Sequence, residues 1–477
     1  MSKHVKACGL YACCCLAALM AGCFPEDSLD WSGDGSVGLL RNDSGLYLVD
    51  GASGALTRVC EGEVFPWPSL SSDGAQIVYG RQISFARLDD GLEALPAVEV
   101  AMIENDARRL RDRILSDTFD TSQFKWNGEH VFGYGDAYRS WLARYVCERG
   151  DERVVRKLGI ELTEEGKAFD LSASRLVIVT RDDLDHKTAI TTSMLPILRP
   201  RLSPDSRHVA YIVPDMHDEE KATLYVAPAA AKSTPVEVRA GVAISYDWRP
   251  DSRALAYVKQ DGDGLLGVVE ETTVVDEAGT LLAELAATPA SAPVGIQRCT
   301  GPRSQPVGTL FQSLMKVQYG RNGRLFFSSP AGKIPTSDLE EPTYSLFCYD
   351  FTTGTVVDVL PASVSSLAGE MVNFFALSPD GMKVLLPMEK HRFAVYTLSD
   401  KTPVVPIEED EEFGDEIPDM LPSWKSNTEI SCLVSGSSRF LGDNAQEQED
   451  RHEIVVLNVD GSFQTHLSGD WSDDVMP

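Results

Sequence analysis

The residues of this chain that could do chemistry are mainly clustered carboxylates. The densest acidic run spans residues 408–416, and smaller ones lie at 215–220 and 261–264. Oxygen-rich loops can bind calcium, but none of these runs has the alternating Asp spacing with a closing Glu that an EF-hand loop requires. We therefore interpret them as solvated loops between strands, with calcium binding as the alternative.

Motifs typical of catalysis do not occur in the sequence. A Gly-x-Ser-x-Gly elbow, which would indicate acyl transfer, is absent. The eight histidines include no His-Glu-x-x-His or His-x-His pair that would indicate a metal site, and the glycines form no phosphate-binding loop. The sequence assigns no catalytic residue, no metal ligand and no cofactor, and it favours a protein that is not an enzyme.

The overall charge restricts the partners of the chain. The formal net charge is −29, and a phosphate-binding surface needs clustered Lys and Arg. This disfavours nucleic acid and anionic lipid headgroups. A small basic run is the exception, and we interpret it as a solvated strand or loop, with a binding patch as the alternative: Arg108-Arg109-Leu110-Arg111-Asp112-Arg113.

A recurring sequence motif predicts the strands and turns that must position any functional site. It consists of an aromatic residue or Leu, then Ser-Pro-Asp-Gly or a variant, then a run of β-branched and aromatic residues. Asp-Gly supplies the turn positions with positive φ, so each copy predicts a β-hairpin. Clear copies begin at Trp31, Leu70, Leu202, Trp248 and Leu377, and degenerate copies begin at Trp126, Leu171, Tyr319 and Trp424.

The spacing of the copies predicts the architecture. Successive copies start 31 to 71 residues apart, typically in the forties, which is the period of a four-stranded propeller blade. A third strand is legible after several hairpins, for example at 45–50, 222–226 and 453–458. We therefore predict an all-β fold, a single β-propeller of four-stranded antiparallel blades. Eight blades are expected, with seven or nine as alternatives and the copy near 126 or 171 as an irregular insertion.

The repeat resembles the WD-like repeat of the TolB family, whose signature is P-x-[WL]-S-P-D-G-x-x-I-A-[FY] followed by [IL]-Y-V-x-D. The resemblance covers residues 29–477 and implies a β-propeller. For function it implies a periplasmic partner of envelope lipoproteins, although we expect this chain to lack the family's separate N-terminal α/β domain. Similar propellers precede the catalytic domain of prolyl oligopeptidase-type enzymes.

The N-terminus has the features of a secretory signal. Residues 1–22 combine a positive head with an apolar run, and residues 19–23 resemble a bacterial lipobox, with Met20 where Leu or Val is commoner. We expect cleavage before Cys23, lipidation of Cys23, and a tether over residues 23–28. An ordinary signal peptide or an uncleaved anchor is the alternative, but the apolar run is shorter than the roughly 20 residues of a spanning helix.

Five cysteines remain beyond Cys23, an odd number that cannot all pair within one chain. Their wide spacing fits no zinc site, and Cys348 and Cys432 lie in strand patterns where Cys acts as a small core residue. One disulfide stays open as a possibility. The five residues are Cys60, Cys147, Cys299, Cys348 and Cys432.

Two functions follow as hypotheses. The first is a lipid-anchored module of the bacterial cell envelope, on its periplasmic or extracellular face, that binds a protein, peptide or envelope polymer without catalysis. The second is a hydrolase or lyase acting on glycans or peptides with carboxylates at the channel mouth. The long stretches at 136–168 and 270–316 are expected to carry function or to form outer strands.

Overall fold

A computed structural model describes most of the propeller region. The described residues are 28–42, 44–62, 64–116, 136–149, 154, 171–215, 222–260, 266–282, 285–289, 294–295, 316–331, 343–361, 365, 369–387, 393–399, 403–404, 422–436, 451–460 and 464–467. Residues 1–27 are not among them, so the predicted signal, Cys23 and most of the tether lie outside the described residues.

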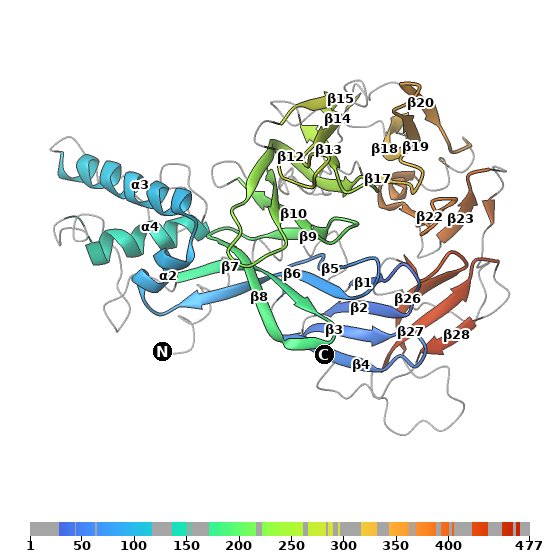
Figure 1. Cartoon of the computed structure of the whole chain (residues 1–477), viewed down its shortest axis with the longest axis horizontal. Coiled ribbons are helices and arrows are strands. Elements are labelled where there is room, and N and C mark those ends of the chain that lie inside the picture. The colour runs from blue at the N-terminus through green and yellow to red at the C-terminus, as the bar shows by residue number, and fades with distance from the viewer. Residues whose placement is uncertain are drawn as a thin grey trace, which may run out of the picture.

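The strands form sheets that surround a common axis (Figure 1). The first sheet contains β1 (Ser28–Trp31), β2 (Val37–Asn42), β3 (Gly45–Asp50) and β4 (Leu56–Glu61). The second contains β5 (Ser69–Leu70), β6 (Gln76–Phe85), β7 (Leu171–Thr180) and β8 (Asp183–Ser193).

The third sheet has eight strands and is the widest. Its path contains β9 (Leu198–Leu202), β10 (His208–Pro214), β11 (Ala222–Pro228), β12 (Val236–Trp248), β13 (Ala254–Gln260), β14 (Leu266–Thr273) and β15 (Ala287–Pro289). The short strand β16 (Val294–Gly295) pairs with β14 off this path.

Three further four-stranded sheets complete the ring. The fourth contains β17 (Val317–Tyr319), β18 (Leu325–Ala331), β19 (Thr343–Asp350) and β20 (Thr355–Asp358). The fifth contains β21 (Ala376–Leu377), β22 (Lys383–Pro387), β23 (Phe393–Thr397) and β24 (Pro403–Val404), and a 3₁₀ turn, η3 (Gly369–Phe374), precedes it. The sixth contains β25 (Ser423–Trp424), β26 (Glu429–Gly436), β27 (Arg451–Asn458) and β28 (Gln464–Leu467).

The predicted propeller is confirmed, but the predicted number of blades is wrong. Within the described residues the ring has six sheets, not the eight expected or the seven or nine given as alternatives. The main reason is the continuous strand β12, which pairs with β11 through its first half and with β13 through its second half. Two copies of the repeat therefore share one sheet. Leu171 begins β7, which pairs inside the second sheet and starts no blade, and Trp126 lies outside the described residues.

The recurring Ser and Asp residues close the hairpin turns, as predicted. Ser378 Oγ donates to Asp380 Oδ1 at 2.6 Å and accepts from the amide of Lys383 at 2.9 Å. Hydrogen bonds from Ser32 and Ser36 lower the pKa of Asp34 to about 2. The same pair recurs at residues 71 and 73 and at residues 203 and 205. These carboxylates therefore accept hydrogen bonds that stabilise the turns of the fold.

The ring closes between its first and last sheets. Strand β1 contacts both β5 and β25, and Trp31 Nε1 donates to Ser431 Oγ at 2.8 Å. The closed ring covers the inner edges of the sheets, which would otherwise offer unpaired backbone groups. The Asp-Trp-Ser echo at residues 470–472 lies outside the described residues.

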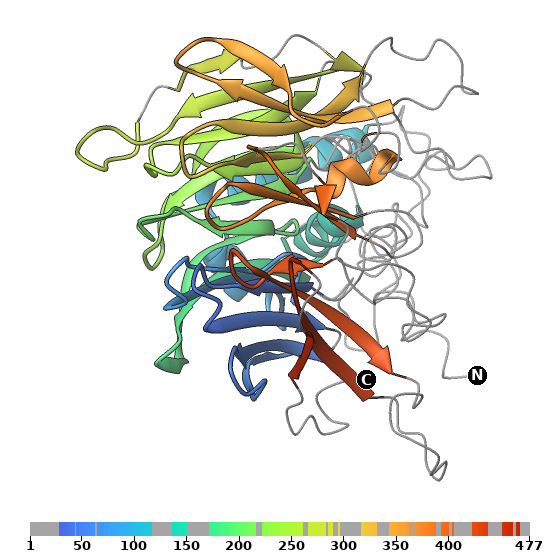
Figure 2. The same cartoon turned by 90° about the vertical axis from the view of Figure 1, so that its right-hand side faces the viewer.

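A helical insertion projects from the side of the ring between β6 and β7 (Figure 1), and its helices lie behind the sheets in Figure 2. It contains α2 (Leu88–Ala94), α3 (Ala97–Leu115) and α4 (Asp136–Arg149). The basic run 108–113 lies in α3, so its interpretation as a strand or loop is wrong. Residues 136–149 form α4 rather than an outer strand. The predicted all-β class therefore describes the ring but not the insertion, which is helical.

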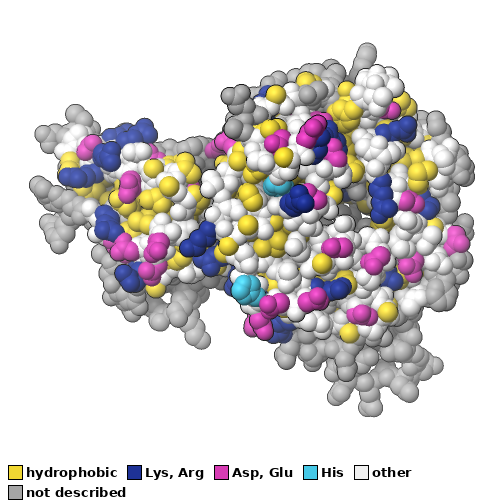
Figure 3. Space-filling model, viewed as in Figure 1, with side chains coloured by type: hydrophobic (Ala, Val, Ile, Leu, Met, Phe, Trp, Pro, Cys, Tyr) yellow, Lys and Arg dark blue, Asp and Glu magenta, His cyan; other side chains and the backbone are white. Residues whose placement is uncertain are grey.

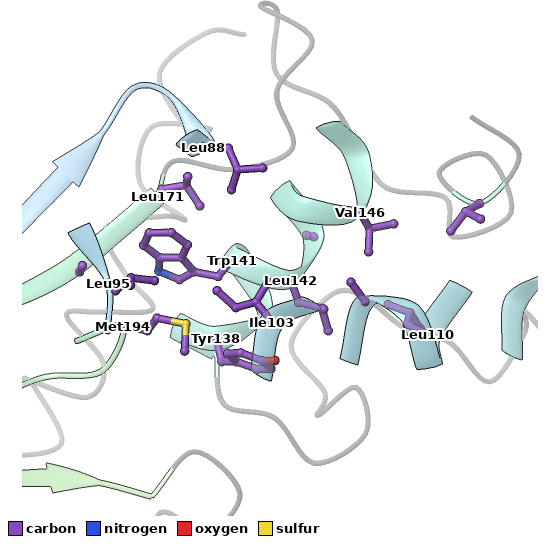
Figure 4. Packing of buried hydrophobic residues seen from close by; sticks show 14 of the residues in the cluster. Leu88, Leu95, Ile103, Leu110, Tyr138, Trp141, Leu142, Val146, Leu171 and Met194 are labelled. Atoms are coloured by element: carbon purple, nitrogen blue, oxygen red, sulfur yellow. The ribbon is translucent and has the colours of Figure 1, made fainter. Parts of the chain in front are cut away.

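The insertion has its own hydrophobic core, which Figure 4 shows. Ile103, Ala107, Leu110 and Ile114 are buried at helical spacing along α3 and pack with residues of α4. Trp141 of α4 is fully buried, and its indole Nε1 donates to the backbone oxygen of Ser172 at 2.7 Å. The core therefore joins the helices to the second sheet.

The cysteines in the described part of the chain are free thiols. Cys60, Cys348 and Cys432 are buried, and Cys147 is half-buried. Burial raises the pKa of the Cys432 thiol to about 12, so this thiol stays protonated. Cys348 and Cys432 are core residues, as predicted, and Cys299 lies outside the described residues.

Candidate functional site

The charged side chains that meet at the centre of the ring come from β1, β9, the second half of β12 and the residue before β17. Just before the aromatic residue or Leu that opens a repeat, a polar side chain can reach the next inner strand. Asp247 Oδ2 accepts from the Tyr319 amide at 2.8 Å, and Gln318 Oε1 accepts from the Leu377 amide at 3.1 Å. This position therefore both links neighbouring strands and faces the axis.

Tryptophans at the next position make the reciprocal links. Trp248 Nε1 donates to the backbone oxygen of Arg201 at 3.1 Å, and Trp424 Nε1 donates to that of Ala376 at 2.9 Å. A buried indole N–H needs a partner, and these carbonyls provide one. The inner strands are thus fixed to each other by specific side chains, which gives the axial residues defined positions.

Five charged residues form what we call the axial cluster: Asp30, Arg199, Arg201, Asp247 and Lys316. Arg201 Nη1 lies 3.0 Å from Asp247 Oδ1. The Arg201 side chain keeps 36 % exposure and that of Asp247 keeps 15 %, and Asp30 is exposed. The cluster is therefore surrounded by protein but accessible to solvent.

A β-bulge positions Arg199 in this cluster. The pairing of β9 with β10 shifts register between Ala210 and Ile212, opposite Arg199 and Pro200. Arg199 has a φ of 49°, and the Tyr246 hydroxyl donates to its backbone oxygen. Pro200 has no N–H for the ladder, which favours a bulge here. Bulges re-aim side chains and are common next to functional sites.

The cations of the cluster repel each other. Burial and the positive charges of Arg199 and Arg201 lower the pKa of Lys316 to about 7, against the pull of Asp247 and Asp30. Burial lowers the pKa of Arg199 to about 10, with a contribution from Arg201. An added anion would relieve this repulsion, so the cluster favours an anionic ligand.

Lys316 is held on one side of the cluster. Its Nζ donates to the backbone oxygen of Phe375 and lies 5.2 Å from the centre of the Phe375 ring. Desolvation raises the pKa of the Asp30 carboxyl, although Arg201 opposes this. The cluster thus combines fixed donors with one amine that can exchange a proton near neutral pH.

The residues singled out in the sequence contribute little to this site. The acidic runs at 408–416 and 261–264 lie outside the described residues, as does most of the run at 215–220. No group of His, Cys, Asp and Glu suited to a metal ion occurs in the described ranges. The sequence held one usable signal for the axial cluster, because charged residues directly precede the repeat starts at Trp31, Leu202 and Trp248.

No helix among the described residues is long and apolar enough to span a membrane. The structure thus defines a β-propeller with a helical insertion and a charged cluster at its axis.

No protein-family model matches the chain, and no curated protein matches it by sequence. Solved structures similar in fold include an oligogalacturonate lyase in complex with manganese, with 13 % identity, a TM-score of 0.41, and coverage of 79 % of this chain and 76 % of that one. A putative TolB from Agrobacterium tumefaciens shows 11 % identity, a TM-score of 0.34, and coverage of 59 % and 84 %. The β-propeller domain of the Trilobed protease from Pyrococcus furiosus shows 13 % identity, a TM-score of 0.36, and coverage of 63 % and 78 %.

Proposed function

We propose that this chain is a non-catalytic binding module that recognises an acidic group of a peptide, protein or envelope polymer at the propeller axis. The observation that carries the proposal is the axial cluster, in which Arg199, Arg201 and Lys316 outnumber Asp30 and Asp247. Arginine presents a planar fork of donors that matches a carboxylate. Arg201 is paired with Asp247, whereas in the described part of the chain Arg199 and Lys316 donate only to backbone oxygens, those of Ile244 and Phe375. The buried Nε of Arg199 has no hydrogen-bond partner among the described residues, so we expect a ligand to engage Arg199 first and Lys316 beside it.

We further propose that the module is anchored in a bacterial envelope membrane through acylated Cys23, as the lipobox-like segment suggests. The short tether would hold the ring near the membrane surface. The lipid chains would provide the anchoring energy, because each buried methylene contributes about 0.8 kcal/mol. Labelling cells with a palmitate analogue is expected to mark the wild-type chain and leave Cys23→Ala unmarked. Equal incorporation in both chains would contradict lipidation at this residue.

The axial proposal predicts that two cations control the binding of carboxylates. A labelled oligoglutamate peptide is expected to bind the wild-type chain, and its oligoglutamine counterpart is not. The double variant Arg199→Asn with Lys316→Gln should raise the Kd by about tenfold or more, which corresponds to about 1.4 kcal/mol. Asn suits position 199 because it tolerates a positive φ. Fluorescence anisotropy at low and moderate salt measures the effect.

A matched control separates the axis from the general charge. Arg181→Asn with Lys187→Gln removes the same charges from two exposed residues, one in the turn after β7 and one within β8, and we expect an unchanged Kd. An equal loss in both double variants, or no binding of oligoglutamate by the wild type, would contradict recognition at the axis. Capture of one envelope protein or polymer from solubilised membranes, lost in the axial variant, would identify the partner.

The second candidate function is a hydrolase or lyase, and Lys316 is the observation that favours it. An amine with a pKa of about 7 is suited to accept a proton near neutral pH. Incubation with glycan and peptide libraries tests this function directly. Turnover that disappears in Lys316→Gln would replace the binding proposal with an enzymatic one.

A further inference from the structure

The helical insertion carries a cavity that is separate from the axis. The cavity has a volume of about 260 Å³ and lies between α3 and α4. Glu104, Ala107, Arg108 and Arg111 line it from α3 at helical spacing, and Tyr145, Val146 and Arg149 line it from α4, together with Val154. Two facing helical stripes thus form one groove, which we call the lobe groove.

The floor and the rim of the lobe groove differ in character. Ala107, Val146 and Val154 are buried and apolar, and Tyr145 is half-buried. Arg108, Arg111 and Arg149 are exposed beside them. Figure 3 shows hydrophobic side chains on the insertion with basic and acidic side chains around them. Glu104 is exposed at the same rim, and Arg149 is paired with Asp89, so Arg108 and Arg111 are the donors available to a ligand. The groove therefore offers an apolar contact next to these two cations, and Tyr and Arg are residue types enriched where partners bind.

The charge of the groove is opposite to that of the chain. Its lining contains three arginines, Arg108, Arg111 and Arg149, and one glutamate, Glu104, whereas the whole chain has a formal net charge of −29. At physiological salt an exposed charge is screened beyond about 8 Å, so a ligand responds to the local surface. An acidic segment would be repelled over most of the protein and attracted here, which directs its approach to the groove.

We propose that the lobe groove binds an acidic peptide segment of a partner protein, with an apolar side chain over Ala107 and Val146 and flanking carboxylates on Arg108 and Arg111. The small volume fits one or two side chains and is below the range of most small-molecule pockets. A planar guanidinium binds a carboxylate through two parallel hydrogen bonds, which fixes the segment along the groove. The site is independent of the axial cluster.

The test uses a labelled peptide with a central Leu flanked on both sides by Glu, and the full-length chain. The wild type is expected to bind it, and Arg108→Ala with Arg111→Ala should raise the Kd about tenfold or more. Tyr145→Ala should also weaken binding. Replacing Leu by Ser in the peptide should weaken it, and replacing Glu by Lys should abolish it. These substitutions lie on the surface or at its edge, and circular dichroism checks that the helices persist.

Two matched controls locate the effect. Arg109→Ala with Arg113→Ala removes the same charge from exposed positions of α3 outside the groove, and Arg199→Asn with Lys316→Gln alters only the axis. Neither should change the Kd of the Leu-containing peptide by more than about twofold. Equal loss in the two α3 double variants would show unspecific attraction and overturn the proposal. If the chain binds phosphatidylglycerol vesicles through Arg108 and Arg111 but does not bind the peptide, the proposal of a peptide ligand is overturned.

Discussion

Replacement of Trp141 by Ala is expected to lower the free energy of unfolding by about 3–5 kcal/mol, the range for removing a buried aromatic side chain from a core. Trp141 is fully buried, and its ring lies edge-on to that of Phe85 with 6.0 Å between the ring centres. A Cβ placed on Gly91 would lie 2.6 Å from the indole ring, so α2 passes close to the indole at a position that only glycine fits. Loss of the indole would leave a cavity among three helices and the second sheet.

The effect of Trp141→Ala should be concentrated in the insertion. Urea unfolding followed by circular dichroism should show the helical signal disappearing before the sheet signal, and limited proteolysis should cut the insertion first. Trp141→Phe keeps much of the volume but removes the hydrogen bond to the Ser172 carbonyl, so it should lose less stability than Trp141→Ala. Val98→Ala is the control, because Val98 lies on α3 with 75 % exposure. A loss no larger than that of Val98→Ala would contradict a docking role for Trp141.

The turn chemistry of the repeats could be predicted from the sequence because it is local. Ser203 and Asp205 are two residues apart, and their hydrogen bond of 2.6 Å forms within one hairpin. Positive φ occurs at Gly381 and also at Ser206, where the fourth residue of the turn is no longer glycine. The turn therefore tolerates this substitution in the copy that begins at Leu202. Because the turn pattern is local, it predicts a hairpin but does not predict which strands belong to the same sheet.

The number of blades depends on pairing over longer distances. Strand β12 remains extended from Val236 to Trp248, with register shifts that let its two halves pair with different neighbours. Nothing in the turn at Trp248 indicates that the strand before it is shared. Counting repeat starts therefore counts hairpins, whereas the number of sheets depends on hydrogen bonds between strands.

The insertion was missed because its signal has a different period. Ile103, Ala107, Leu110 and Ile114 follow the spacing of an α-helix, but they lie in a chain whose other segments alternate as strands do. The axial cluster was missed for another reason. Asp30, Arg201 and Asp247 are far apart in sequence and meet only because the ring closes, although their shared position before a repeat start indicated a common place in the fold.

The pH dependence of stability is expected to depend on Glu99, which joins α3 to the end of β8. Its Oε2 accepts from the Met194 amide at 2.8 Å, and burial raises the pKa of its carboxyl to about 7 despite this hydrogen bond and one from Ser193. The ordinary value is 4.5. Between these two values the folded state binds more protons than the unfolded state, so stability falls as pH rises. The stability that protonated Glu99 contributes is thus fully present below pH 4.5 and is lost above about pH 7.

The change in pKa from 4.5 to about 7 lowers the free energy of unfolding by about 3 kcal/mol between pH 4.5 and pH 8, since one pKa unit is about 1.4 kcal/mol and a small part of the effect lies outside this range. Glu99→Gln keeps an oxygen that can accept from Met194 but cannot ionise, so the variant should match the wild type near pH 5 and exceed its stability by that amount at pH 8. Glu93→Gln is the control, because Glu93 is an exposed residue of α2, and its profile should parallel that of the wild type. Urea midpoints from pH 5 to pH 8 measure the difference. Parallel profiles for the wild type and Glu99→Gln would show that the carboxyl is charged throughout this range, and that the hydrogen bond from Met194 outweighs its desolvation.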